Sequence, residues 1–398
     1  MTRSLFIRNY KVVDGMERLI QECNAKLLNT SDTYDIVDRV LADNVGEEAF
    51  FIVDLARIQQ QYETWTKLLP MVRPYYAVKC NPNPVIIKYL ALLGCHFDCA
   101  SKNEISSVLD ITEDPSLIIF ANPCKMSGQI KYARAVDVDT MTFDSDHELY
   151  KIKLYHPNAQ LILRLKVDDN GSKCQFGCKF GCPLDQVDDL LKIAKTLRLN
   201  VVGFSFHVGS GCRDAQLYIK AIDNCLAASE LARELGFFTD IIDIGGGFEP
   251  ETFLQFAKVI DEKVREHPQF QWIAEPGRFM VSGSHILVVN VIGKKKVGDR
   301  YVYYMNDGVY GSFNCIYFDH AQPEVCPFNE RDGPRYPSTI FGPTCDSLDK
   351  IADDVQLPEL AIGEWCYVDS FGAYTQASSS SFNGFSNDRI RYVMTSDE

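Results

Sequence analysis

The feature that most constrains this chain is an alternation, between residues 70 and 275, of eight short apolar runs with longer polar stretches. Stretches such as Pro183–Leu197 and Asp214–Leu235 carry apolar residues at the spacing of an amphipathic helix. Repeated strand–helix units of this kind predict a parallel sheet covered by helices, and eight of them favour a closed (β/α)8 barrel. The predicted strands are Arg73–Lys79, His96–Ala100, Ser116–Ala121, Thr140–Asp144, Gln160–Leu165, Asn200–His207, Thr239–Ile244 and Gln271–Ala274.

An open, doubly wound sheet could use the same elements, so the positions of polar residues matter. Most of the predicted strands end in or beside a residue with chemical capability. In a barrel, the carboxyl ends of all eight strands converge on one mouth, where residues far apart in sequence become neighbours. These strand-end residues are Lys79, Asp98, Asp144, Arg164, His207, the triplet Gly245–Gly247 and Glu275.

After residue 280 the pattern changes to strand-like runs such as HILVVNVIG and RYVYYM, separated by Gly, Pro and Asp turns. This pattern predicts an antiparallel β-domain. The early run Leu5–Val13 has a similar character and predicts a strand that joins the same domain. The predicted fold class is therefore α/β plus β, a (β/α)8 barrel over residues 54–282 inserted into an antiparallel β-domain made of residues 1–53 and 283–398.

Charge and composition narrow the class of protein. A formal net charge of −14 disfavours a nucleic-acid partner or an anionic membrane, because either needs a cationic surface. The N-terminus lacks the apolar core of a signal peptide, and no run of 18 apolar residues occurs, so we expect a soluble, cytoplasmic protein. The 14 cysteines then read as free thiols. Cys174, Cys178 and Cys182 lack the second pair that a structural zinc site needs, and no metal is predicted.

Lys79 is the first candidate catalytic residue. It ends an apolar run beside Tyr76 and Val78, where partial desolvation favours the neutral, nucleophilic amine that a Schiff-base lysine requires. A lysine that merely extends to solvent from a strand end is the alternative.

A phosphate site is indicated after the seventh and eighth strands, where barrels commonly hold one. The glycines of DIGGGF leave backbone N–H groups open to an anion, and EPGR adds the guanidinium of Arg278. Glycine-rich turns that serve backbone geometry alone are the alternative. Glu275 could face a pyridine nitrogen and keep it protonated, and His207 could stack on the same ring. A structural histidine is the alternative for His207.

The second domain offers further candidates. Cys345 and Asp346 follow each other in a Gly-Pro loop, which places a thiol beside an anion, and an ordinary loop thiol is the alternative. Asp319 together with Asp346 would make an anionic pocket for an ammonium group. Isolated surface carboxylates are the alternative for each.

Nine motifs in order, PYYAVKCN, FDCASKNE, SFHVGSGC, DIGGGF, AEPGR, NDGVYGSFN, FDH, GPTCDSLD and GAYT, resemble those of the eukaryotic ornithine decarboxylases, which have the alanine-racemase-like fold and use pyridoxal 5'-phosphate. The resemblance runs over nearly the whole chain and favours the functional interpretation of each candidate. It implies a homodimer with two active sites, each shared between one subunit's barrel and the other subunit's β-domain, and a small basic amino acid as substrate.

The resemblance also assigns roles. Lys79 would carry the cofactor as a Schiff base, Glu275 would pair with its ring nitrogen, and His207 would stack on the ring. Cys345 of the partner subunit would return a proton to the substrate. The remaining expected cofactor-binding residues are Asp98, Arg164, Ser210, Gly245, Gly246, Gly247, Gly277, Arg278 and Tyr374, and the expected substrate-binding residues are Asp319, Asp346, Tyr310, Phe318 and Phe382.

The predicted reaction is decarboxylation of L-ornithine to putrescine and CO2. Two alternatives stay open: a lysine or arginine decarboxylase of the same fold, and a non-catalytic regulator that resembles antizyme inhibitor. Retention of Lys79, Asp98, Glu275 and Cys345 together argues against the regulator. Phe279 and Phe318 stand where relatives often carry Tyr, and Ser347 where many have Gly, which puts substrate contacts near Asp346 in doubt. A regulatory partner of the antizyme type is compatible with the resemblance.

Overall fold

The structure is a computed structural model that describes residues 3–43, 46–168, 172–173, 177–329, 331–386 and 388–396. For residues 3–12 it describes the backbone alone. Its contacts divide the chain into two compact units. One, here called the barrel unit, is Gln61–Met280. The other, here called the β unit, combines Met1–Gln60 with Val281–Glu398. No described helix is both long enough and apolar enough to cross a membrane.

The barrel unit contains a closed barrel of eight parallel strands, which confirms the predicted fold class. Neighbouring strands pair in chain order, and the last, β10, closes the barrel by pairing Trp272 with Val72 of β3. Each strand overlaps its predicted run, and no boundary differs by more than two residues. The strands are β3 (Val72–Ala77), β4 (His96–Cys99), β5 (Ile118–Phe120), β6 (Thr140–Phe143), β7 (Gln160–Arg164), β8 (Asn200–Ser205), β9 (Ile241–Asp243) and β10 (Gln271–Ala274).

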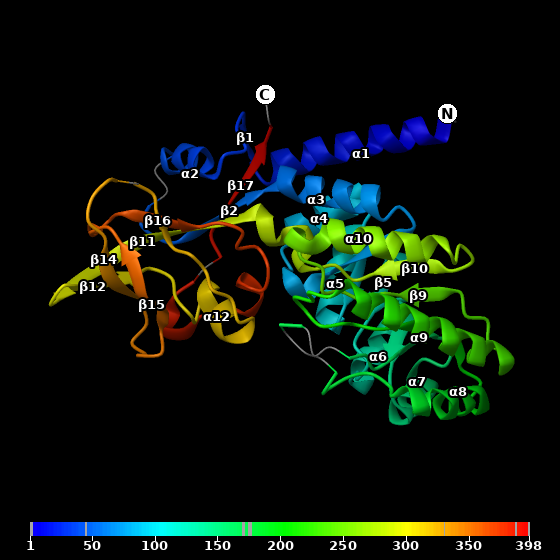
Figure 1. The fold of residues 1–398 in the computed structure, drawn as a ribbon. Helices are drawn as coiled ribbons and strands as arrows, with labels where there is room; N and C mark the ends of the chain where they lie inside the picture. Colours follow the sequence, from blue (N-terminus) through cyan, green and yellow to red (C-terminus); the bar gives the residue numbers. More distant parts are fainter. Residues whose placement is uncertain are drawn as a thin grey trace. The chain divides into compact units, whose positions relative to one another are not determined.

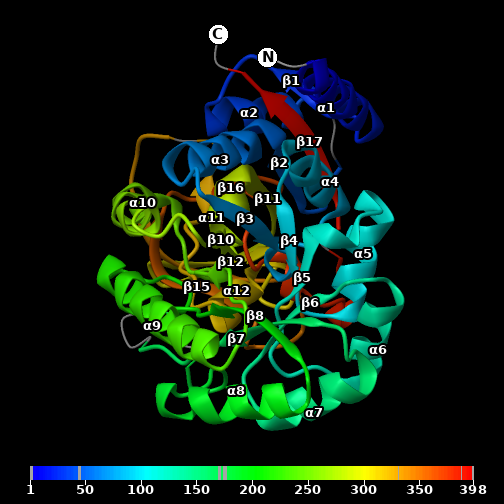
Figure 2. The same ribbon diagram turned by 90° about the vertical axis from the view of Figure 1, so that its right-hand side faces the viewer.

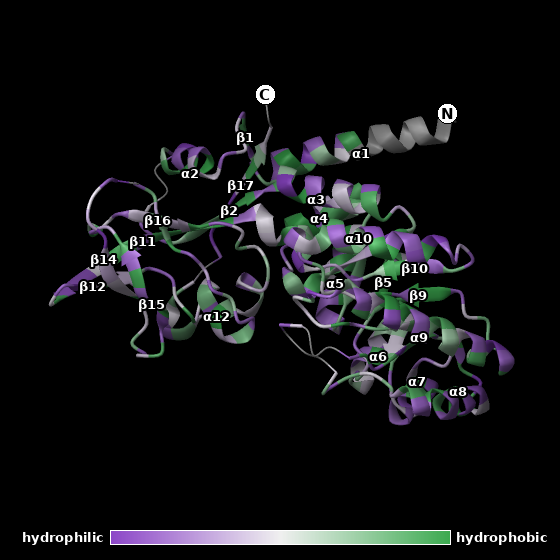
Figure 3. Cartoon of the chain, viewed as in Figure 1, coloured by the Kyte–Doolittle hydropathy of each residue, from purple (hydrophilic) through white to green (hydrophobic). Residues whose placement is uncertain are grey.

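Helices lie around these strands, as Figure 2 shows. Their apolar residues follow helical spacing: α8 buries Val187, Leu190, Leu191 and Ala194, whereas strands such as β9 and β10 are largely apolar (Figure 3). The helices are α4 (Pro84–Leu93), α5 (Lys102–Thr112), α6 (Ser127–Ala135), α7 (Asp146–Tyr155), α8 (Val187–Thr196), α9 (Ala215–Glu234) and α10 (Pro250–Arg265).

Local sequence signals fix where these helices begin and end. The side chain of Asn83 accepts hydrogen bonds from the first N–H groups of α4, and Pro84 occupies the first turn, where a missing N–H costs nothing. Gly94 ends the helix in the left-handed region at φ 96°. The side chain of Ser101 caps α5 by accepting from the Glu104 N–H. These boundaries place the strand ends, and hence the site residues that follow them.

The β unit is built on a nine-stranded sheet. Figure 1 draws its strands β1 and β2 in blue and the others in yellow to red, because they come from the two parts of the chain that flank the barrel. The sheet is mixed rather than purely antiparallel, so the prediction of an antiparallel domain was wrong in this respect. β17 runs parallel to β1 and β2, and β12 runs parallel to β14. The strands are β1 (Lys26–Leu28), β2 (Phe50–Asp54), β11 (His285–Val297), β12 (Arg300–Met305), β13 (Cys326–Pro327), β14 (Tyr336–Phe341), β15 (Lys350–Leu357), β16 (Trp365–Val368) and β17 (Ile390–Thr395).

The predicted strand Leu5–Val13 is also wrong, because this segment is part of helix α1 (Arg3–Glu22). Apolar residues recur at helical spacing through Val12, Met16 and Leu19, a pattern that becomes visible only when the window extends past the predicted run. The other helices are α2 (Thr33–Leu41), α3 (Leu55–Leu68), α11 (Arg278–Val281) and α12 (Cys315–Phe318). The buried face of α2 packs on β2, β11 and β17.

Candidate active site

Lys79 and Asp98 lie at the carboxyl ends of two neighbouring strands. Lys79 stands in the short 3-10 helix Val78–Cys80 directly after β3, and Asp98 on β4 pairs in register with Ala77. The Lys79 Nζ donates a hydrogen bond to Asp98 Oδ2. The side chain of Lys79 is 40% exposed, whereas that of Asp98 is 0% exposed. Asp98 therefore holds the amine from the buried side, while part of the Lys79 side chain stays exposed to solvent.

Glu275 follows β10 and lies beside Asp243, the last residue of β9. Burial raises the pKa of Glu275 well above its usual value, and the carboxylates of Asp243 and Asp98 raise it further. Burial also raises the pKa of Asp243 to about 6. Two carboxyl groups this close and this buried cannot both be charged, so the pair retains a proton at neutral pH.

Asp243 was not among the predicted site residues. The signal was present in the sequence, because Asp243 ends a predicted buried run and lies two residues before the first glycine of the triplet. Its Oδ1 accepts a hydrogen bond of 2.9 Å from the Gly245 N–H, so the carboxylate also positions the loop.

His207 lies two residues after β8 with a neutral ring. Its Nδ1 accepts a hydrogen bond of 3.0 Å from the Gly209 N–H, which leaves the proton on Nε2. Burial lowers the pKa of His207 well below its usual value, and the charges of Arg164 and Lys79 lower it further. Arg164 is the last residue of β7. Burial lowers the pKa of Arg164, although the nearby Glu275 carboxyl group acts to raise it. A neutral imidazole can stack on an aromatic ring without bringing a charge.

The positions of the glycine triplet have no room for a side chain or have a backbone conformation that favours glycine. Gly245 and Gly247 have φ of 65° and 100°, in the left-handed region that favours glycine. A Cβ on Gly246 would lie 2.7 Å from the Glu275 carbonyl oxygen. At Gly277, a Cβ would lie 2.9 Å from that of Cys80. These loops therefore pack backbone against backbone next to Glu275 and His207.

Arg278, at the start of α11, adds a guanidinium beside these loops. Its Nη2 donates to Ser210 Oγ at 3.4 Å, and its Nε lies 3.6 Å from Glu249 Oε1. A guanidinium, a hydroxyl and glycine-rich backbone suit a phosphate group. Together with an amine at Lys79, a proton-holding carboxyl at Glu275 and a neutral ring at His207, the donor set fits pyridoxal phosphate.

Three predicted residues of the β unit come together. The Tyr310 hydroxyl donates to Asp346 Oδ2, and this bond raises the pKa of Tyr310. The ring centroids of Tyr310 and Phe382 lie 4.4 Å apart. Cys345 is exposed, and its N–H donates to Asn383 Oδ1 at 3.0 Å. A carboxylate and a free thiol are thus presented side by side on one loop.

The remaining predicted residues of the β unit are less closely grouped. Asp319 follows α12 and is 6% exposed, whereas the neighbouring Phe318 is 73% exposed. Tyr374 has φ 57°, which is strained for a residue with a bulky side chain. Of the three clustered cysteines, Cys178 is exposed and Cys182 is buried, while Cys174 lies outside the described residues.

A closed barrel whose strand ends carry a lysine, a proton-holding carboxyl pair and an anion-binding loop defines a class, the barrel enzymes that use pyridoxal phosphate. The family model for the pyridoxal-dependent decarboxylase, pyridoxal binding domain, matches residues 55–282. The chain belongs to the eukaryotic ornithine decarboxylase family of pyridoxal-dependent decarboxylases.

Relatives and solved structures agree on the family but carry different names. A probable ornithine decarboxylase of Dictyostelium discoideum is 45% identical, over 88% of this chain and 81% of the relative. Antizyme inhibitor 2 of Xenopus laevis is 43% identical, over 95% and 89%. The crystal structure of the Paramecium bursaria Chlorella virus arginine decarboxylase bound to agmatine has a TM-score of 0.88 at 37% identity, over 90% of this chain and 100% of that structure.

Proposed function

We propose that the protein decarboxylates L-ornithine to putrescine and CO2, as a cytoplasmic homodimer with shared active sites. The observation that carries the proposal is the bond between Lys79 and the buried Asp98 at the barrel mouth. A catalytic lysine needs such a partner to orient its amine, whereas a lysine that only reaches solvent does not. Ornithine decarboxylases among the relatives, at 41–45% identity, support the choice of reaction.

The chain's own residues suit distinct parts of this reaction. Bound pyridoxal phosphate supplies an electron sink for the pair left on Cα when CO2 departs. The Lys79 amine would hold the cofactor. Glu275 already holds a proton in the buried pair with Asp243, so it can share that proton with the ring nitrogen. The neutral imidazole of His207 would lie against the cofactor ring.

We assign the phosphate-binding and ring-contacting roles to residues of the barrel unit and to Tyr374 of the β unit. The proposed phosphate ligands are Ser210, Gly245, Gly246, Gly247, Gly277, Arg278 and Tyr374, with Arg164 near the ring and Asp98 behind Lys79.

The β unit of the partner subunit would complete each site. Cys345 would return a proton to Cα, and Asp346, held by Tyr310, would receive the distal ammonium of the substrate. Asp319, from the cofactor's own subunit, would provide a second carboxylate for the same cation, and Phe318 and Phe382 would contact its methylenes. The buried carboxylate of Asp319, which is 6% exposed, favours a substrate with an ammonium group at its distal end. Because one methylene changes selectivity by only about 1–3 kcal/mol, lysine and arginine are the competing substrates.

The test is CO2 release by the purified protein with pyridoxal phosphate and L-ornithine, L-lysine or L-arginine in parallel, with Lys79→Ala as the blank. We expect strong preference for ornithine, and a loss of that preference in Asp319→Asn. Preference of the unmodified protein for lysine or arginine would contradict the substrate but retain the reaction.

Cys345 has a separate test. Cys345→Ala should divert product from the diamine to the aldehyde, because the proton would then reach the cofactor carbon instead of Cα. Cys124→Ala, which removes another exposed thiol, is the matched control and should leave the product unchanged. A normal diamine yield from Cys345→Ala would remove Cys345 from this role.

A non-catalytic regulator is the second candidate, because antizyme inhibitor 2 is as similar as the decarboxylases are. A regulator would release no CO2 from any of the three amino acids. It would also lack the visible absorbance of lysine-bound cofactor that disappears on borohydride treatment. Presence of both signals, with loss of both in Lys79→Ala, would exclude it.

A further inference from the structure

Two carbonyl groups of the glycine triplet are held by neighbours within the barrel unit. The Gly245 carbonyl oxygen accepts a hydrogen bond of 2.7 Å from the Glu275 N–H. The Gly246 carbonyl oxygen accepts one of 2.8 Å from the hydroxyl of Tyr218, a residue of α9. The C=O and N–H groups of one peptide unit point in opposite directions, because the unit is planar and trans. The N–H of Gly246 therefore points away from the Glu275 N–H, and the N–H of Gly247 points away from Tyr218.

These two N–H groups are donors without an acceptor in the part of the chain that the structure describes. Gly246 is buried and Gly247 is half-buried, so water alone does not readily satisfy them. An unpaired N–H in such a place costs free energy unless a ligand accepts from it. Successive N–H groups in a turn with left-handed residues are a common arrangement for binding an anion, and Gly247 has φ 100°.

Tyr218 is held firmly by its packing. Its side chain is fully buried, and its ring centroid lies 5.0 Å from that of Phe248 and 5.8 Å from that of Phe256. Burial raises the pKa of Tyr218 well above its usual value, so the hydroxyl keeps its proton at neutral pH. The hydroxyl is therefore a fixed donor to the Gly246 carbonyl oxygen.

The glycine triplet lies next to the other candidate phosphate ligands. A Cβ added to Gly247 would lie 2.3 Å from the Gly209 carbonyl oxygen, and Ser210 follows in the chain. The Ser210 hydroxyl in turn accepts from Arg278. Backbone N–H groups, a hydroxyl and a guanidinium are thus gathered in one region.

We propose that Tyr218 is a positioning residue for the cofactor phosphate, because it holds the Gly246 carbonyl group so that the Gly247 N–H faces the phosphate. The inference rests on the proposed function in one respect, that the glycine triplet receives pyridoxal phosphate. Tyr218 itself would not touch the cofactor. Without its hydroxyl, the peptide unit between Gly246 and Gly247 would turn more freely, since glycine on both sides restricts rotation little.

Tyr218→Phe is the test, because it removes the hydroxyl and keeps the packed ring. The cofactor is removed, and the protein is titrated with pyridoxal phosphate or with pyridoxal, which has the same aldehyde but no phosphate. The absorbance of lysine-bound cofactor measures binding. Affinity for pyridoxal phosphate should fall about 10-fold, the lower end of what one hydrogen bond to a charged group contributes, and affinity for pyridoxal should change less than about 2-fold. A purely structural role would weaken both alike.

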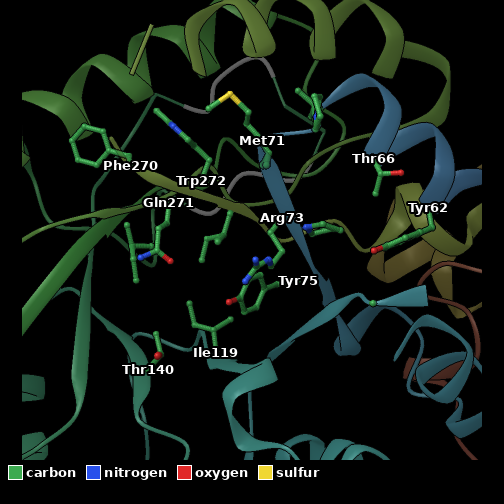
Figure 4. Close-up of a pocket in the computed structure, with 17 residues that line it drawn as sticks. Tyr62, Thr66, Met71, Arg73, Tyr75, Ile119, Thr140, Phe270, Gln271 and Trp272 are labelled. Carbon is green, nitrogen blue, oxygen red and sulfur yellow. The ribbon is translucent and has the colours of Figure 1, made fainter. Parts of the chain in front are cut away.

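Tyr75→Phe is the matched control. Tyr75 is a half-buried tyrosine of the same unit, and it lines a cavity together with Val72 and Gln271, the first residues of β3 and β10 (Figure 4). This cavity lies at the ends of the strands opposite to the glycine triplet. Loss of the Tyr75 hydroxyl should therefore leave both affinities unchanged, and thermal unfolding shows whether each variant is folded.

A second measurement needs no variant. In unmodified, cofactor-free protein labelled with 15N-glycine, inorganic phosphate should shift the amide resonances of Gly246 and Gly247. Absence of a shift at both glycines would overturn the inference.

The affinities decide the role of Tyr218 separately from the reaction. An equal loss of affinity for both ligands in folded Tyr218→Phe, or no loss for either, would overturn the inference even if ornithine is decarboxylated. The expected ratio without CO2 release from any amino acid would support the role of Tyr218 and reject the decarboxylase. Failure of the unmodified protein to bind pyridoxal phosphate would overturn both.

Discussion

Lys125 is a buried lysine of the barrel unit whose removal should be costly. Its side chain is 0% exposed, and its partner Glu148 is 2% exposed. The Nζ donates to the carbonyl oxygens of Asn122 at 3.1 Å and Thr142 at 2.5 Å, and lies 2.9 Å from Glu148 Oε1. It therefore joins the loop after β5 to the end of β6. Lys125→Met keeps most of the volume but leaves these three acceptors without their buried donor.

The magnitude follows from the broken pair. Removal of one partner of a buried ion pair costs about 3–5 kcal/mol, because the other charge stays buried. For a unit the size of Gln61–Met280, each kcal/mol lowers the melting temperature by about 2–4 °C, so we expect a fall of roughly 6–20 °C. Addition of Glu148→Gln to Lys125→Met should recover part of this loss, since it removes a buried charge whose remaining ion pair is with Lys151 at 2.5 Å, a residue whose side chain is 31% exposed.

The assay is thermal unfolding followed by circular dichroism, with urea unfolding as a second measure. Lys220→Met on the exposed surface of α9 is the matched control and should change stability by less than about 0.5 kcal/mol. If Lys125→Met unfolds at the same temperature as the control, the reasoning that this ion pair is desolvated and rigid is refuted.

Three further predictions concern the barrel mouth. Gly247→Ala should destabilise the protein by about 1–3 kcal/mol, since φ is 100° and the new Cβ would lie 2.3 Å from a carbonyl oxygen; Gly128→Ala, which meets nothing within 4 Å, is the control in thermal unfolding. The raised pKa of Asp243, about 6 against an ordinary 3.8, stabilises the protonated form, so the cofactor-free protein should lose stability as pH rises from about 4 to 6. Urea unfolding across this range should show a smaller loss in Asp243→Asn, and an identical pH profile would contradict the assignment. The ring of His207 should not titrate between pH 5 and 8, because its pKa is lowered well below 6.5 and its Nδ1 accepts a backbone bond; a titrating proton resonance in NMR spectra, absent from His207→Asn, would show otherwise.

The barrel was predictable because strands of a parallel sheet are buried on both faces. Such strands read as continuous apolar runs, and the amphipathic helices between them separate the runs clearly. The pairing directions in the β unit were not predictable in the same way. β17 joins β2 across more than 300 residues, and nothing within either strand specifies that they run parallel. The helix α1 was missed because a short window of apolar residues fits both periods.

Part of the site was also predictable from strand order. Lys79 and Asp98 end neighbouring strands, so their contact follows once the barrel is assumed. The shared proton of Glu275 and Asp243 could not be predicted, because it depends on how deeply both side chains are buried.

The pairing of β2 has a consequence for synthesis of the chain. β2 is buried along its whole length, but its partners β11 and β17 are translated only after the entire barrel. At about 5–20 residues per second, the roughly 230 residues before β11 take about 10–45 s to synthesise. During that time the barrel can close on the ribosome, while the apolar strand FFIV waits exposed. Chaperone demand during translation should therefore centre on this strand, which is made before the barrel and paired only after it.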